Sequence, residues 1–285
     1  MLAARPNLHT VTETPGAAEN SSPRFDILAG DPRSPVLLHV PHASRVIPAW
    51  VRAGIVLDDE ELARELDAMT DAHTDLIADV VCQRAACRPW QFVNRTSRLV
   101  VDPERFPDER EEMAAVGMGA VYSATSTGAT LRLPDAARDS RLLDEFFAPY
   151  SDRFADQVDE RLAAAGWAIV LDLHSYPLHL LPYELHQDDA RPEICLGVDQ
   201  IHTPEWLVAA ARSALAPFGS VTVNEPFRGT YVPLRHYGSD QRVSSLMLEI
   251  RRDVYTRTDG TPDPDRIELL GAAIATVVDE STRGG

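Results

Sequence analysis

The sequence is poor in cysteine, has no long apolar run and carries too little positive charge to balance its acids. The three cysteines are an odd number and form no Cys-x-x-Cys pair, so neither a disulfide framework nor a thiolate zinc site is indicated, and a reducing compartment fits. No stretch approaches the roughly 18 apolar residues of a membrane span, and residues 1–24 lack the apolar core of a secretory signal. We therefore expect a cytoplasmic protein with a disordered tail over residues 1–24.

The formal net charge of −17 limits the kinds of partner that the protein can bind. Such a charge opposes non-specific binding to nucleic acid and to anionic membranes. An anionic ligand would need a local cluster of arginines. With 285 residues, of which 44% are hydrophobic, the chain is long enough for one sizeable core. We expect a small-molecule partner, no nucleic acid or membrane partner, and a monomer or small homo-oligomer.

Short apolar runs alternate with helical patterns along the chain, which predicts an α/β fold. We expect a single three-layer α/β/α domain over residues 25–285, with a mostly parallel mixed sheet. The long irregular stretch 103–138 is expected to cover the site. Strands are predicted at residues 25–28, 36–42, 91–102, 168–177, 194–198, 221–223 and 245–252. Helices are predicted from residue 58 to beyond residue 66, and at about residues 74–86, 139–165, 204–216 and 265–281.

Two of the predicted strands end in histidines, which suggests a metal site. The first strand finishes on His42, and the other carries His174 near its carboxyl end, where open α/β sheets place their ligands. Two histidines, one carboxylate and an open fourth position form the usual catalytic zinc arrangement, although another divalent metal is possible. Asp71 and Asp75 lie four residues apart and are both candidates for the carboxylate. A helix cap or a solvated acidic face is the alternative explanation for either aspartate.

A carboxylate within the last predicted strand, Glu249, is the natural general base. Apolar residues flank it, and a core tolerates such a group only if it is paired or functional. An ion pair with Arg251 or Arg252 is the alternative explanation. His236 is a second candidate catalytic residue. Ser175 follows a histidine, but no Gly-x-Ser-x-Gly elbow surrounds it, so a serine hydrolase is not indicated.

Arginines could hold the carboxylates of an anionic substrate through bidentate hydrogen bonds. Arg98 is the best candidate because it lies inside a predicted strand rather than in a loop. We expect several other arginines to form ordinary surface ion pairs, because the chain is so acidic. The further candidates for substrate binding are Asn94, Arg95, Arg105, Ser175, Arg228 and Tyr231.

Six short motifs, in this order, resemble those of the N-formylglutamate amidohydrolase family. They span about residues 36–255, most of the chain, and the combination is specific although each motif alone is weak. The motifs are Val40-Pro41-His42-Ala43-Ser44, Asp71-Ala72-His73-Thr74-Asp75-Leu76, Ser97-Arg98-Leu99-Val100-Val101-Asp102 with Arg105, Asp172-Leu173-His174-Ser175, Phe227-Arg228-Gly229 with Arg235-His236-Tyr237-Gly238, and Leu248-Glu249.

The resemblance implies a fold related to that of zinc carboxypeptidases, zinc held by His42, His174 and an acidic residue, and Glu249 as the base. It also implies cleavage of the formamide of N-formyl-L-glutamate to formate and glutamate, the last step of one route of histidine degradation. Position 45 lacks the glutamate that carboxypeptidases carry three residues after their first zinc histidine. We therefore choose Asp75 as the third ligand.

One departure from the family pattern keeps other functions open. Glu104 stands where the family commonly has the amide of an Asp-x-Asn-Arg motif, and this change could alter the grip on the substrate's carboxylates. The second hypothesis is hydrolysis of another N-acyl amino acid or of a C-terminal peptide bond. A metal-binding protein without turnover is a third hypothesis, against which the complete set of His42, His174 and Glu249 argues.

Overall fold

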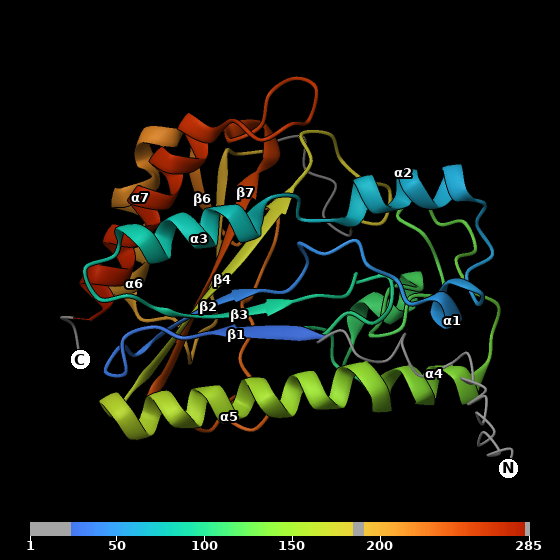
Figure 1. Cartoon of the computed structure of the whole chain (residues 1–285), viewed down its shortest axis with the longest axis horizontal. Helices are drawn as coiled ribbons and strands as arrows, with labels where there is room; N and C mark the ends of the chain where they lie inside the picture. The colour runs from blue at the N-terminus through green and yellow to red at the C-terminus, as the bar shows by residue number, and fades with distance from the viewer. Residues whose placement is uncertain (1–23, 185–190, 283–285) are drawn as a thin grey trace, which may run out of the picture.

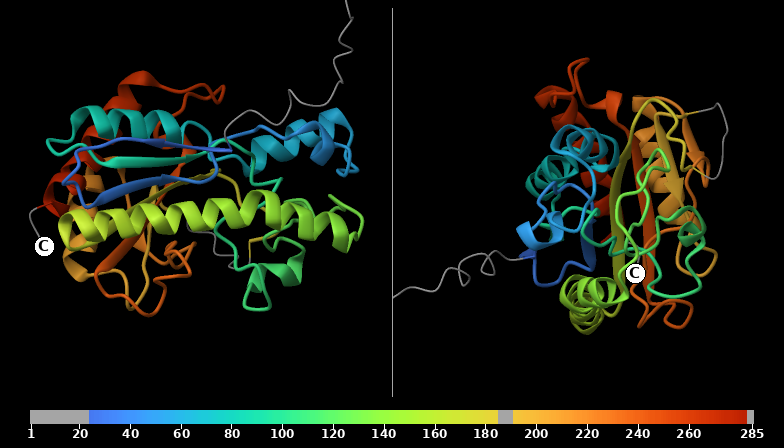
Figure 2. Two further views of the ribbon diagram at one scale, coloured as in Figure 1. Left: turned by 60° about the horizontal axis from the view of Figure 1, so that its bottom comes forward. Right: turned by 90° about the vertical axis from the view of Figure 1, so that its right-hand side faces the viewer.

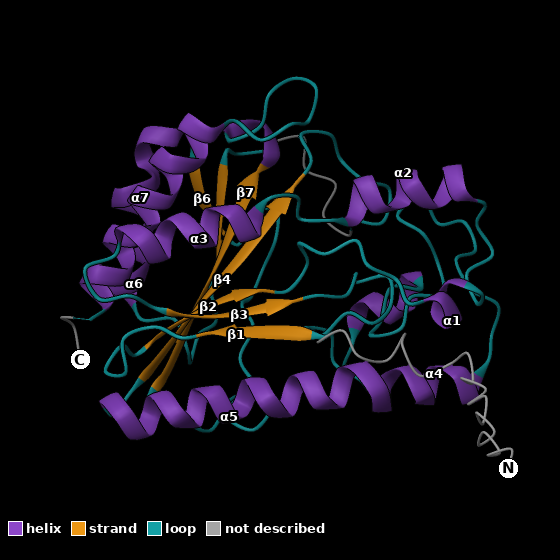
Figure 3. Cartoon of the chain, in the orientation of Figure 1, coloured by secondary structure: helices purple, strands orange, loops and turns teal. Residues whose placement is uncertain are grey.

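The computed structural model describes residues 24–184 and 191–282 (Figure 1). The tail that is predicted to be disordered lies outside the described residues, except for Arg24. Figures 1 and 3 show a single twisted sheet through the centre of the chain, with helices on both of its faces. The predicted three-layer α/β/α arrangement is therefore confirmed.

The sheet is mixed and mostly parallel at its centre, as predicted. Its strands are β1 (Phe25–Leu28), β2 (Val36–Val40), β3 (Trp90–Asn94), β4 (Ala168–Tyr176), β5 (Ile194–Gly197), β6 (Val221–Val223) and β7 (Val243–Arg251). Their order across the sheet is β1-β3-β2-β4-β7-β5-β6. β3, β2, β4 and β7 are parallel neighbours, whereas β1 runs antiparallel to β3 and β5 antiparallel to β7.

Helices cover the two faces of the sheet unequally. They are α1 (Ala49–Arg52), α2 (Asp59–Met69), α3 (Thr74–Arg84), α4 (Ala136–Leu142), α5 (Ala148–Ala165), α6 (Glu205–Leu215) and α7 (Pro264–Ser281). α3, α6 and α7 lie together on one face, and α5 runs along the other (Figure 2). Of the helices in residues 24–184 and 191–282, none combines the length and the apolar character needed to cross a membrane.

Alternate residues of the central strands fill two separate apolar layers. Leu38 and Leu171 pack on the side of α3 and α7, whereas Leu37 and Val170 pack against Phe154 of α5. Successive side chains of a strand point to opposite faces of the sheet. The same alternation carries every second residue near the carboxyl ends of β2, β4 and β7 to the α5 side, and this decides where polar side chains gather.

Two predicted boundaries differ from the structure by more than two residues. β3 ends at Asn94 because the Asn94 side-chain oxygen accepts hydrogen bonds from the Thr96 backbone N–H and hydroxyl, which turns the chain out of the sheet. Arg98 consequently lies in a turn and not inside a strand. The long helical region begins before residue 139, at Ala136, because Asp135 caps it, and a π-helical turn then joins α4 to α5.

The segment between β3 and α4 is tied to the body of the protein by buried polar contacts. Arg132 is 1% exposed and donates to the carbonyls of Tyr122 and Leu99. Glu65 of α2 accepts hydrogen bonds from the Ser126 backbone N–H and hydroxyl, each at 2.7 Å. Several residues of the segment line the cavity described below, so the segment forms one wall of the site.

Candidate active site

Polar side chains from three parallel strands meet at one cavity on the α5 side of the sheet. His42 follows β2, and His174 and Glu249 lie at paired positions near the ends of β4 and β7. All three line a cavity of about 710 Å³, within the size range of small-molecule pockets. The carboxyl ends of parallel strands, where open α/β sheets bind their ligands, thus carry the candidate site.

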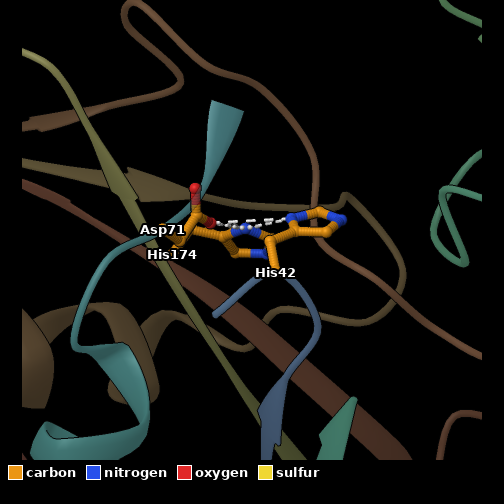
Figure 4. A group of neighbouring side chains, drawn as sticks. All are labelled: His42, Asp71 and His174. Atoms are coloured by element: carbon orange, nitrogen blue, oxygen red, sulfur yellow. Dashed lines mark hydrogen bonds and ion pairs between the residues drawn. The ribbon is translucent and has the colours of Figure 1, made fainter. Parts of the chain in front are cut away.

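Asp71 joins the two histidines in a buried triad (Figure 4). The Oδ2 atom of Asp71 lies 3.0 Å from Nδ1 of His174 and 3.5 Å from Nδ1 of His42. The two Nδ1 atoms are 3.3 Å apart, and none of the three residues is more than 4% exposed. The two Nδ1 atoms and the Asp71 Oδ2 atom, each of which can bind a metal ion through a lone pair, therefore lie close together.

These residues fit a divalent cation at that point. Tetrahedral bonds of about 2.0–2.1 Å place neighbouring ligand atoms about 3.3 Å apart, close to the separations in the triad. Imidazole nitrogen and carboxylate oxygen are also donor types that Zn²⁺ binds readily. A cation between these two ring nitrogens, which are 3.3 Å apart, would let both keep their lone pairs as ligands. The triad of His42, Asp71 and His174 is therefore a candidate metal centre.

The carboxylate of the triad is Asp71, which corrects the choice of Asp75. The Asp71 backbone N–H donates to the carbonyl of His42 at 3.0 Å, so the loop before α3 is tied to the end of β2. His73 takes the left-handed conformation, with a φ of 67°, and turns the chain into α3. Asp75 falls in the first turn of that helix and accepts a hydrogen bond from the Leu76 N–H at 3.0 Å. The four-residue spacing is misleading because the helix begins between the two aspartates.

Two buried aspartates, to which sequence analysis assigned no role, flank the outer nitrogens of the triad histidines. Asp102 Oδ1 lies 3.0 Å from Nε2 of His42, and Asp172 Oδ1 lies 3.1 Å from Nε2 of His174. Such carboxylates favour the tautomer in which Nε2 carries the proton and Nδ1 keeps the lone pair for a metal. Burial alone would raise the pKa of Asp102, but Arg98 and His42 hold it well below its usual range. The spacing of Asp172 and His174 was an available signal, since residues two apart in a strand share a face.

Glu249 is a carboxylate beside the triad that forms no ion pair among the described residues. It is 8% exposed, and its Oε2 atom has no hydrogen-bond partner among the described residues. Burial raises the pKa of Glu249 to about 7; Asp71 acts in the same direction and His174 in the opposite one. Arg251 pairs with Glu193 at 2.7 Å, and no ion pair of Glu249 is found in the described ranges. A carboxyl group of this kind can take up and release a proton near neutral pH, as a general base must.

The arginines of the cavity differ in how far their charge is neutralised. Arg98 donates to Asp102 at 2.7 Å and to the Tyr122 hydroxyl at 3.0 Å, and Arg105 lies 3.5 Å from Asp102. Arg228 is exposed, lines the cavity wall and forms no ion pair within the described part of the chain. The charge of Arg228 is therefore more available to an anionic ligand than that of Arg98 or Arg105.

The family model of N-formylglutamate amidohydrolases matches residues 34–256, which contain the triad, the flanking aspartates and Glu249. The chain belongs to this family. The predicted resemblance is thereby confirmed. A curated relative, the N-formylglutamate deformylase of Pseudomonas aeruginosa, is 29% identical over 255 residues, which cover 86% of this chain and 90% of the relative.

Two solved structures have the same fold as this amidohydrolase family member. The N-formylglutamate amidohydrolase of Ralstonia eutropha superposes with a TM-score of 0.75 at 20% identity, covering 91% of this chain and 97% of that one. A protein of Agrobacterium tumefaciens superposes with a TM-score of 0.65 at 22% identity, covering 93% of this chain and 95% of that one. At such low identities the likeness shows the fold alone.

Most residues predicted for the site of an N-formylglutamate amidohydrolase do line the cavity. All of them except Tyr231, a polar residue after Gly229, stand in a family motif or at the end of a predicted strand. They are His42, Arg98, Arg105, His174, Ser175, Arg228, Tyr231 and Glu249, together with Asp71, the alternative ligand.

Besides Asp75, three predicted site residues lie outside the cavity lining and contact other parts of the fold. Asn94 donates to the Pro41 carbonyl at 2.9 Å, and Arg95 pairs with an aspartate of β1 at 2.7 Å. The Nε2 atom of His236 lies 2.8 Å from the carboxylate of Asp159 on α5. The substrate-binding role of Asn94 and Arg95 and the catalytic role of His236 therefore stay predictions, which these contacts do not support. Their nearness in sequence to family motifs did not indicate the side of the chain on which each side chain lies.

Proposed function

We propose that this protein hydrolyses the formamide of N-formyl-L-glutamate to formate and glutamate with the help of a divalent metal ion, Zn²⁺ by preference. The observation that carries the proposal is the buried triad of His42, Asp71 and His174 beside the unpaired carboxylate of Glu249. Membership of the family and the deformylase named in Pseudomonas aeruginosa support the same reaction.

His42, Asp71 and His174 would hold the ion. A divalent cation at the triad supplies Lewis acidity, which polarises an acyl oxygen and makes water easier to deprotonate. Glu249 takes one proton from the attacking water while the water oxygen bonds to the formyl carbon. Glu249 then passes this proton to the nitrogen as the C–N bond breaks. Formate and glutamate leave, and Glu249 returns to its carboxylate form.

Binding of the substrate's carboxylates depends on Arg228. N-formyl-L-glutamate carries two carboxylates, and the charges of Arg98 and Arg105 are already offset by Asp102. The free guanidinium of Arg228 can form a bidentate pair with one substrate carboxylate. Ser175 and Tyr231 line the same cavity and add hydrogen-bonding groups to it.

Replacing Glu249 by Gln tests the proposed base. The variant keeps the shape of the side chain but cannot accept the proton, so formate release should fall by roughly 10²- to 10⁴-fold. Bound zinc, measured by metal analysis, should stay at the wild-type level because Glu249 is outside the triad. Glu112→Gln removes an exposed carboxylate of the same cavity and should keep wild-type turnover. Full activity in Glu249→Gln would rule out this residue as the base.

A larger N-acyl amino acid is the second candidate substrate, because a cavity of about 710 Å³ is in the range that accepts drug-sized ligands. Turnover of N-formyl-L-glutamate, N-formyl-L-aspartate and N-acetyl-L-glutamate, with and without chelator, separates the two candidates. Chelator-sensitive release of formate that is selective for N-formyl-L-glutamate supports the first. Faster turnover of N-acetyl-L-glutamate would favour the second.

A further inference from the structure

Glu104 is a carboxylate of the cavity that the proposed reaction leaves without a role. Its Oε2 atom lies 3.3 Å from Nε2 of His174 and 3.6 Å from Nε2 of His42. These nitrogens are on the far side of each ring from the Nδ1 atoms of the triad. Its Oε1 atom lies 3.4 Å from Nδ1 of His39, and only 14% of the side chain is exposed. One carboxylate group therefore contacts the outer edges of both triad rings and a third histidine.

The charge of Glu104 is not offset by an arginine. Asp102, the neighbouring carboxylate, lies 2.7 Å from Arg98 and 3.5 Å from Arg105, so its charge is largely neutralised. Within the described ranges, the ion pairs of Glu104 are with histidines alone. A largely buried carboxylate that no arginine offsets interacts strongly with the histidines that it faces, because its surroundings screen its charge weakly.

The outer nitrogen of His174 is the group best placed to respond to Glu104. His174 is 4% exposed, and its Nε2 atom makes no hydrogen bond of good geometry among the described residues. The nearest acceptors are the carboxylates of Asp172, at 3.1 Å, and Glu104, at 3.3 Å. Two carboxylates therefore flank the outer nitrogen of this ring, whose Nδ1 atom faces Asp71 at 3.0 Å.

The backbone explains why Glu104 reaches this position. Asp102 Oδ1 accepts a hydrogen bond from the Glu104 N–H at 3.2 Å and also lies 3.0 Å from His42 Nε2. Pro103 stands between the two acids and restricts the backbone there. A stretch of three residues thus presents two carboxylates to His42, of which Glu104 also reaches His174 and forms no ion pair with an arginine among the described residues.

We propose that Glu104 is a positioning residue that sets the metal affinity of the triad. Its negative charge and its contacts with the two outer ring nitrogens orient His42 and His174 and make their Nδ1 atoms stronger ligands for a divalent cation. Glu104 acts through the rings and does not coordinate the ion. Carboxylates in such positions change metal affinity by roughly 10- to 100-fold. The inference depends on the proposed function because it takes the triad to be a metal site.

The test is zinc binding to metal-free protein, measured by competition with a chromogenic chelator. Wild type, Glu104→Gln and Glu112→Gln are compared, because Glu112 lines the same cavity and has no histidine contact among the described residues. We expect one Zn²⁺ per chain in all three proteins. The affinity of Glu104→Gln should be roughly 10- to 100-fold lower, and that of Glu112→Gln within about threefold of wild type, since exposed charges act weakly.

Two further measurements keep the test decisive. Circular dichroism and melting of the metal-free proteins check that Glu104→Gln folds, and Glu104→Asp, which keeps the charge, should recover most of the affinity. Unchanged zinc affinity in Glu104→Gln would overturn the inference, as would an equal loss in Glu112→Gln. Two Zn²⁺ per wild-type chain, one of them lost in Glu104→Gln, would also overturn it because Glu104 would then be a ligand.

The outcome for the wild type separates this inference from the proposed function. A wild-type protein that binds no zinc would remove the metal site of the proposed function and the inference with it. A wild-type protein that binds zinc and releases formate, next to a Glu104→Gln variant that binds zinc equally well, would remove the inference alone.

Discussion

Asp71 and Asp75, which are four positions apart, lie in very different surroundings on either side of the start of α3. Asp71 is 3% exposed and lies between two histidines. Burial alone would raise the pKa of Asp71, but contacts with His174 and His42 lower it below its usual range. Asp75 is half-buried in the first turn of α3, where a carboxylate interacts favourably with the helix dipole. The two aspartates therefore have separate roles, one in the triad and one in the helix.

Paired substitutions of the two aspartates test this difference. Asp71→Asn should lower the zinc affinity by more than the roughly 10- to 100-fold typical of an outer carboxylate, because it changes a ligand itself. Asp75→Asn should leave the zinc affinity near that of wild type and cost only about 0.3–1 kcal/mol of stability. Zinc titration and chemical denaturation measure the two effects. Equal losses of zinc affinity in the two variants would contradict the assignment of Asp71.

At the scale of elements, the site depends on how separate pieces of chain are held against one another. β2 and β4 are parallel neighbours, so the histidines near their carboxyl ends reach the same edge of the sheet. The segment between β3 and α4 forms the facing wall, where the contact of Glu65 with Ser126 joins it to α2. Glu65 is 5% exposed, and its loss would leave two donors of Ser126 without their acceptor.

The contact of Glu65 in α2 with Ser126, in the segment between β3 and α4, predicts a local loss of stability. Glu65→Ala should lower the free energy of unfolding by about 1–3 kcal/mol and speed hydrogen exchange in residues 123–131. Zinc affinity should not change, because Glu65 does not contact the triad. Glu60→Ala, on the exposed side of α2, removes a pair with Arg64 at 3.8 Å and should cost less than about 0.5 kcal/mol. Equal destabilisation by the two substitutions would show that the buried contact does not hold the segment.

At the scale of the whole molecule, the triad connects distant parts of the chain. His42 follows β2, Asp71 lies in the loop before α3, and His174 lies in β4, 103 residues after Asp71. An ion that binds only this folded arrangement stabilises it by mass action, by about 2.7 kcal/mol at a free concentration one hundred times the Kd. The metal centre should therefore stabilise the fold as well as take part in the reaction.

Removal of the metal tests this stabilisation. Chelation of zinc-loaded protein should lower the Tm by several degrees, the shift expected when a domain of this size loses a few kcal/mol. Added Zn²⁺ should restore the Tm. Asp71→Asn serves as the control, because chelator should not change the Tm of a protein whose triad is incomplete. A wild-type Tm that is the same with zinc and with chelator would contradict a folded-state metal site.

The α/β class, most of the strands and helices, and the meeting of His42, His174 and Glu249 at one site could be predicted from the amino-acid sequence. Apolar periodicity and residue type are local properties, so they can be recognised along the chain. The tertiary structure alone decided that Asp71 completes the triad, that Arg228 keeps a free charge and that Asn94, Arg95 and His236 lie outside the cavity. These features depend on which elements are neighbours in the sheet and on which charges neutralise each other across the fold, and both are relations between residues far apart in sequence.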